Sequence, residues 1–193
     1  QEALNKVLHE IGAQGYVEPS KELFASFIEN WFTSHFEKRI KDTTASNAHS
    51  LINKHLIREN PFANKPLSKI TTEDIDAFYN LKIDEEYSSS YIRKMHQMLN
   101  QAFTQAVKWK RIKYNPVTDA DPPAVKKEEM KIWSYDEINT FLEHCEGERH
   151  YLTFFLAIYT GMRRGEILGL KWSDIDFLNK TIHVQRSLAY ISK

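Results

Sequence analysis

The chain has 193 residues, of which 41% are apolar, so it can form one large domain or two small ones around a real core. Its 26 basic residues balance its 26 acidic ones, and bulk charge therefore gives no argument for a nucleic-acid partner. A single cysteine excludes an internal disulfide and fits a cytoplasmic location. The longest apolar run, residues 151–162, is shorter than the ~20 residues of a membrane span, so no membrane partner is expected.

Hydrophobic periodicity predicts a series of helices over the first 117 residues. A short amphipathic helix is expected at residues 3–11, followed by four longer helices at 23–36, 43–56, 72–83 and 88–112. Four helices with short connections indicate a compact helical domain. We interpret residues 19–117 as that domain and residues 1–18 as the end of an upstream region or linker.

The periodic pattern breaks at Asn115-Pro116. Residues 118–131 are polar and contain proline, which favours an interdomain linker. A second domain is expected at residues 132–193. There, Ser134-x-x-Glu137 predicts a capping box for a helix, residues 149–160 predict a buried helix, and residues 181–188 predict a strand.

Charge is segregated along the helical domain. Residues 71–87 carry six acids against Lys82, whereas residues 88–118 carry six Lys or Arg and no acid. Cations beside amide donors suit phosphate contacts together with base-edge contacts in duplex DNA. The predicted DNA contacts are Lys41, Thr43, Thr44 and Lys54 in one patch, Arg93, Lys94, Gln97, Gln101 and Lys108 in a second, and Lys126 and Lys127 in the linker. The alternative for each cluster alone is a solvated helix face.

The most informative stretch is residues 160–176, Thr-Gly-Met-Arg-Arg-Gly-Glu-Ile-Leu-Gly-Leu-Lys-Trp-Ser-Asp-Ile-Asp. Gly161 lets the backbone reverse after an apolar helix, and Arg163 then stands at the start of a new one. A guanidinium offers two parallel N–H donors to a phosphate, and Glu166 can orient it from one turn away. Arg164 is a further candidate for the DNA backbone. The alternative is that Arg163 only caps a helix or pairs with Glu166 on the surface.

This stretch resembles the first arginine motif of the tyrosine recombinase, or phage integrase, family. In that motif Thr-Gly-x-Arg-x-Gly-Glu is followed by Leu-x-Leu-x-Trp-x-Asp-Ile-Asp, which places Arg163 on the catalytic arginine and Glu166 on its supporting carboxylate. The resemblance implies a mainly α fold. It consists of a four-helix SAM-like core-binding domain linked to a truncated α+β catalytic domain with a small antiparallel sheet.

The resemblance also implies an activity. In this family a tyrosine attacks a backbone phosphate of double-stranded DNA without a metal or other cofactor, giving a 3′-phosphotyrosyl link and a free 5′-hydroxyl. Site-specific integration of a phage or conjugative element at DNA attachment sites is therefore expected, with self-association on DNA in the full-length protein. The family's lysine, His-x-x-Arg and nucleophilic tyrosine are expected beyond Lys193. Tyr190 stands where the family places no nucleophile, so these 193 residues are predicted to be an inactive fragment.

Two other classes remain open from the sequence. One is a helical DNA-binding regulator without chemistry, and the other is a helical protein-interaction module whose basic face is only solvated. The DNA-binding classes predict an affinity that falls steeply with salt, and the interaction module does not.

Overall fold

The computed structural model describes residues 21–125 and 129–189. The chain divides into two compact units, Gln1–Lys127 and Glu128–Lys193. The predicted helix at 3–11, the region 1–18 and the linker residues Lys126 and Lys127 lie outside the described residues.

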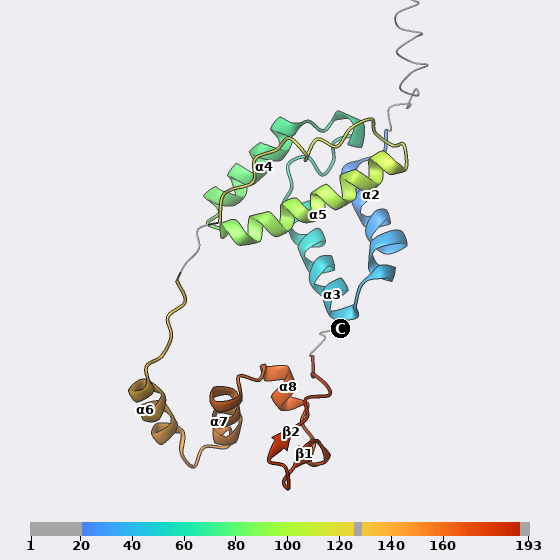
Figure 1. Cartoon of the computed structure of the whole chain (residues 1–193). Helices are drawn as coiled ribbons and strands as arrows, with labels where there is room; N and C mark the ends of the chain where they lie inside the picture. Colours follow the sequence, from blue (N-terminus) through green and yellow to red (C-terminus); the bar gives the residue numbers. More distant parts are fainter. Residues whose placement is uncertain (1–20, 126–128, 190–193) are drawn as a thin grey trace, which may run out of the picture. The chain divides into compact units, whose positions relative to one another are not determined.

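Four helices form the described part of the first unit (Figure 1). They are α2 (Phe24–Trp31), α3 (Asp42–Leu51), α4 (Thr72–Asp84) and α5 (Ser89–Lys108). Both α2 and α3 continue in π-helical turns, at Phe32–Phe36 and Ile52–Arg58. The prediction of a mainly helical fold with a four-helix domain is confirmed.

Local signals in the sequence fix where these helices begin. The Thr71 hydroxyl accepts a hydrogen bond from the Asp74 N–H, and the Asp74 carboxylate accepts one from the Thr71 N–H, which makes a capping box for α4. Ser88 caps α5 through the N–H of Tyr91. These caps satisfy backbone donors that would otherwise lack a partner.

An aromatic core holds the four helices together. Phe24 of α2 stacks on Phe103 of α5 with ring centroids 5.5 Å apart and meets Phe62 edge to face at 5.1 Å. The apolar stripe of α5 is completely buried in this core, at Ile92, Met95, Leu99, Ala102, Phe103 and Ala106. The predicted apolar face of α2 is buried as well, except for Leu23, which is 39% exposed.

A buried ionic network joins α3, α4 and the turn that leads into α5. The side chain of Lys82 is 0% exposed, and its ammonium donates to Glu59 at 3.0 Å and to Glu85 at 2.7 Å. Glu59 also pairs with Nδ1 of the buried His55 at 2.9 Å. The rings of Tyr87 and Tyr91 pack edge-on against the His55 ring. The network therefore ties the end of the π-helical turn to the start of α5.

Buried histidines predict a pH dependence of stability for this unit. Burial lowers the pKa of His55, against the opposing effect of Glu59, and it also lowers the pKa of His96, which hydrogen-bonds to the Tyr79 hydroxyl. The unfolded chain then binds protons near pH 6.5 that the folded unit does not. Stability is full above that pH and is lost as the pH falls below it, by up to about 1.4 kcal/mol per pH unit per proton.

Urea unfolding at pH 7.5, 6.0 and 5.0 measures this dependence. His96→Gln keeps a hydrogen-bonding group beside Tyr79 and should make the loss of stability toward pH 5 shallower. His49→Gln, at an exposed position, is the matched control and should leave the slope unchanged. An unchanged slope in the His96 variant contradicts this explanation.

The second unit contains three helices in its described part, α6 (Tyr135–Cys145), α7 (Tyr151–Thr160) and α8 (Arg164–Leu168). The predicted capping box at Ser134 and Glu137 is confirmed, with the Ser134 N–H donating to Glu137 at 2.7 Å. Two short strands, β1 (Ile175–Asp176) and β2 (Thr181–Ile182), pair antiparallel with Ile175 opposite Ile182. The prediction of a small antiparallel sheet is confirmed.

Two details of the second unit differ from the sequence-based expectation. The strand predicted at 181–188 ends at Ile182, because the Leu188 N–H bonds to the Gly165 carbonyl and Arg186 turns toward Gly169 and Asp174. The helix predicted to be buried, α7, has no buried residue, and Leu152 is 62% exposed. It is apolar on all sides, and in the described chain its neighbours α6 and α8 cover only part of it.

Within residues 21–125 and 129–189, no helix combines the length and the apolar character needed to cross a bilayer.

Candidate nucleic-acid interface and arginine site

A groove with a volume of about 930 Å³ lies in the first unit, where α3 and its π-helical turn meet the first half of α5. Five of the predicted DNA contacts line it, and they come from both helices. These are Thr44 and Lys54 from one wall and Lys94, Gln97 and Gln101 from the other. The structure thus brings part of each predicted patch into one concave surface, although they are some 40 residues apart in the sequence.

Lys54 is one of the two lysines that line this groove. Its ammonium donates to the Tyr87 hydroxyl at 3.2 Å and lies 5.7 Å from the centre of the Tyr87 ring. The hydrogen bond to Tyr87 raises the pKa of Lys54. Tyr87 is in turn held by the buried network, because its ring also packs on His55 and lies 5.5 Å from the Lys82 ammonium. Tyr87 therefore holds the Lys54 ammonium in position at the surface of the groove.

The other predicted DNA contacts do not line the groove. Arg93 uses its Nε to donate to the Pro123 carbonyl at 2.9 Å, which ties α5 to the segment after it. Lys41 precedes α3, Thr43 lies on its first turn, Lys108 ends α5, and Arg164 is exposed in the second unit. Lys126 and Lys127 lie outside the described residues. All of these assignments stay predictions.

Several groove residues were not singled out from the sequence as candidates. Asn47 lies one turn after Thr44 on α3, and Tyr87, Tyr91 and Met98 complete the lining around the amides of α5. Asn47 follows Thr44 at i+3, a spacing that places two residues on one helix face and that was available in the sequence. Tyr91 and Met98 are partly buried and pack against the edge of the core.

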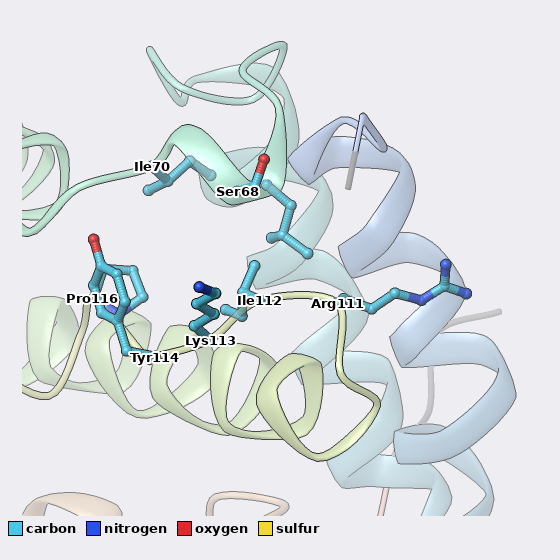
Figure 2. Close-up of a pocket in the computed structure, with 8 residues that line it drawn as sticks. Ser68, Ile70, Arg111, Ile112, Lys113, Tyr114 and Pro116 are labelled. Atoms are coloured by element: carbon cyan, nitrogen blue, oxygen red, sulfur yellow. The ribbon is translucent and has the colours of Figure 1, made fainter. Parts of the chain in front are cut away.

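A second, smaller hollow lies at the far end of α5 (Figure 2). Its volume is about 140 Å³, and it is lined by Leu67, Ser68, Ile70, Arg111, Ile112, Lys113, Tyr114 and Pro116. None of the predicted site residues lines it, and Arg111 extends away from it in Figure 2. This hollow therefore adds nothing to the candidate interface.

Arg163 in the second unit is the residue that precedes α8. Its side chain is 86% exposed, and its Nη1 donates to Glu166 Oε1 at 3.1 Å. The other oxygen of Glu166 accepts the Arg163 backbone N–H at 2.8 Å. This backbone bond, assisted by the guanidinium, lowers the pKa of Glu166 and keeps it charged. Glu166 therefore holds the guanidinium from one side and leaves its remaining N–H groups open to solvent.

Two glycines of the motif have specific structural roles. Gly161 ends α7 in the left-handed conformation, with φ of 66°, as the sequence predicted. At Gly165 a Cβ atom would lie 2.6 Å from the Leu188 carbonyl oxygen, so only glycine allows this segment to pass so close to α8. Together they fix the direction in which Arg163 leaves α7 and the surface against which α8 packs.

An ion pair between Arg186 and Asp174 connects the segment after β2 to the turn before β1. Asp174 is 3% exposed, and Arg186 donates to both of its carboxylate oxygens, with Nη2 to Oδ1 at 3.0 Å. The hydrogen bond from Arg186 lowers the pKa of Asp174. Residues 183–186 read His-Val-Gln-Arg, so a His-x-x-Arg does follow Arg163, contrary to the expectation that this motif lies only beyond Lys193. Arg186 is committed to Asp174, which indicates a structural role for this copy of the motif.

Two family models match this chain, one in each of its two units. Residues 23–83 match the family model described as phage integrase, N-terminal SAM-like domain, and residues 131–192 match the phage integrase family itself. The chain belongs to the phage integrase family. These integrases are tyrosine recombinases, the class to which the arginine motif had been compared.

Individual relatives cover much of this chain. A "Tyrosine recombinase XerC-like" protein of Caldanaerobacter subterraneus subsp. tengcongensis is 31% identical over 145 residues, which span 72% of this chain. The ICEBs1 integrase of Bacillus subtilis is 28% identical over 143 residues and 73% of this chain. The chain spans 37% and 38% of the lengths of these two relatives.

Among solved structures, a lambda integrase dimer bound to a COC' core site is similar, with a TM-score of 0.71 and 26% identity. The match covers 89% of this chain and 47% of that one.

Proposed function

We propose that this integrase chain acts in site-specific recombination, integrating a mobile element into double-stranded DNA. The observation that carries the proposal is the exposed Arg163, held by Glu166 within the family's arginine motif. We assign residues 19–117 to DNA binding, 118–131 to a linker, 132–193 to the first part of the catalytic domain and 1–18 to the end of an upstream region. Action on DNA attachment sites would place the protein in the cytoplasm.

In this proposal the groove between α3 and α5 binds the duplex. Lys54 and Lys94 neutralise backbone phosphates, and the amides of α5 face base edges. Neutralising phosphates releases bound counterions, so affinity depends steeply on salt. The similar lambda integrase is a dimer on its core site, which supports self-association of the complete recombinase on DNA.

In the chemical step Arg163 stabilises charge on the scissile phosphate. Its free N–H groups bind two nonbridging oxygens, whose negative charge grows as the attacking oxygen bonds to phosphorus and the 5′ oxygen leaves. Glu166 fixes the guanidinium and thereby reduces the reorganisation needed on binding. We further propose that residues 1–193 alone do not cleave DNA, since no residue after Arg163 matches the family's lysine or nucleophilic tyrosine and Arg186 is occupied by Asp174.

A salt titration of the 193-residue chain tests DNA binding directly. On a 30-base-pair duplex, Lys54→Ala and Lys94→Ala are each expected to reduce affinity and to lower the slope of log K against log salt by about 0.9, the value for one phosphate contact. Fluorescence anisotropy at several salt concentrations between roughly 50 and 200 mM measures both quantities.

Lys113→Ala is the matched control, because Lys113 is an exposed lysine at the smaller hollow. It should leave both the affinity and the slope unchanged. A weak interaction without salt dependence would instead favour the protein-interaction module. Equal effects of all three substitutions would place the duplex somewhere other than the groove.

A further inference from the structure

The groove is lined by side chains that can form directional hydrogen bonds, in addition to the lysines that would suffice for contacts with phosphates. Besides its lysines, the groove exposes three amides, from Asn47 on α3 and from Gln97 and Gln101 on α5. None of these amides hydrogen-bonds to another described residue. Exposed amides without partners, on facing walls of one groove, are free to bind a ligand that has paired donors and acceptors.

The chemistry of base edges in the major groove separates the possible targets. An Asn or Gln amide matches the N6 donor and N7 acceptor of adenine, whereas arginine or lysine matches guanine and a carboxylate matches cytosine. An apolar side chain matches the thymine methyl. The composition of the lining therefore indicates which base pairs it can recognise.

No arginine takes part in this lining. None of the four arginines between residues 21 and 125 lines the groove. Arg39 is bonded to His35 at 2.9 Å, and Arg93 is bonded to the Pro123 carbonyl. The carboxylate among the lining residues is Glu86, which lies in the turn before α5 and on neither wall. The cations of the groove are lysines, whose compact charge suits phosphates rather than planar, bidentate recognition.

Neighbouring side chains on α5 are close enough to contact the same base pair or two adjacent base pairs. Gln97 and Gln101 are one turn apart on the same face, and neighbours at this spacing have Cβ atoms about 5–6 Å apart. Met98 lies beside them, partly buried, with its side chain at the groove surface. An amide and a flexible apolar side chain thus face the same region of a docked duplex.

We propose that the groove between α3 and α5 recognises A·T base pairs through the major groove. Gln97 and Gln101 bind adenine, and Met98 contacts a thymine methyl in the same or the next base pair. This inference rests on the proposed DNA-binding function and specifies the class of sequence that the core-binding domain selects.

Selection of duplexes from a random-sequence library by the 193-residue chain tests the proposal. Enriched duplexes should share A·T pairs at fixed positions. Within one such duplex, replacing the recognised adenine by 7-deazaadenine removes the N7 acceptor and should weaken binding about tenfold. Replacing the thymine by uracil removes only the methyl group and should weaken binding roughly threefold.

Matched variants assign each effect to its side chain. The 7-deazaadenine penalty should disappear in the Gln97→Ala, Gln101→Ala double variant, and the uracil penalty should disappear in Met98→Ala. Gln105→Ala, on the same helix but outside the groove lining, should retain both penalties. Enrichment of G·C pairs, binding without base preference, or penalties that persist in the groove variants each overturn this inference and leave DNA binding intact. Failure to retain any duplex would instead overturn the proposed function.

Discussion

In the recombinase that we propose contains these residues, replacing Arg163 by alanine should reduce DNA cleavage about 10³-fold, the usual effect of removing one donor to developing negative charge. Arg163→Lys restores a charge but offers no second, parallel N–H group, so it should recover only a small part of the rate. DNA binding should change little, because we assign most of the affinity to the groove of the first unit. Single-turnover cleavage of a suicide substrate measures the rate, and an electrophoretic shift measures the binding.

Arg149→Ala is the matched control for this prediction, since Arg149 is an exposed arginine of the second unit that lies outside the arginine motif. It should leave the cleavage rate within a few fold of the original. The 193-residue chain by itself should form no phosphotyrosyl adduct on the same substrate. If Arg163→Ala weakens binding but spares cleavage, the role of Arg163 as a catalytic residue is wrong and the regulator hypothesis gains support.

The second large effect is expected at Lys82. Lys82→Ala removes a side chain that is 0% exposed and leaves Glu59 and Glu85 beside an empty space. Breaking a buried ion pair costs about 3–5 kcal/mol, and the partial exposure of both glutamates should reduce this to roughly 2–4 kcal/mol. The free energy of unfolding, from urea titration of the 193-residue chain, measures the loss.

A second variant separates the charge from the volume. Lys82→Met keeps most of the volume and removes the charge, so it should be less destabilising than alanine. Lys113→Ala, at an exposed position, should change the stability by less than about 0.5 kcal/mol. Because the network also holds Tyr87 and His55 at the groove, the Lys82 variants should bind DNA more weakly even where they remain folded. Unchanged stability in both variants contradicts this role of the network.

The sequence predicted the helices of the first unit well because their signals are local. The apolar stripe of α5 and the capping residues Thr71 and Ser88 depend only on neighbours in the chain. The groove was not predictable in the same way, since it exists only where α3 meets α5. Lys82 gave no sign of burial either, because it stands among acidic residues that suggest a solvated surface.

The errors in the second unit have a related origin. Alternation at residues 182–185 favoured a longer strand, but the Leu188 N–H bonds to the Gly165 carbonyl and the Arg186 side chain turns toward Asp174. The apolar sequence of α7 predicted a buried helix, and this prediction was wrong for the described residues, because its two helical neighbours cover only part of its surface. The family motif around Arg163 required no such tertiary information, since its residues are contiguous.

The π-helical turn at Ile52–Arg58 determines how this segment tolerates a change in length. A π turn holds more residues than an α turn. Deleting one residue there should return the segment to ordinary α geometry, and side chains beyond the deletion should keep nearly their present directions. Deleting one residue from α3 itself should instead rotate every later side chain of the helix by about 100°. Homologues one residue shorter at 52–58 should therefore keep the wall of the groove, whereas homologues one residue shorter within α3 should not.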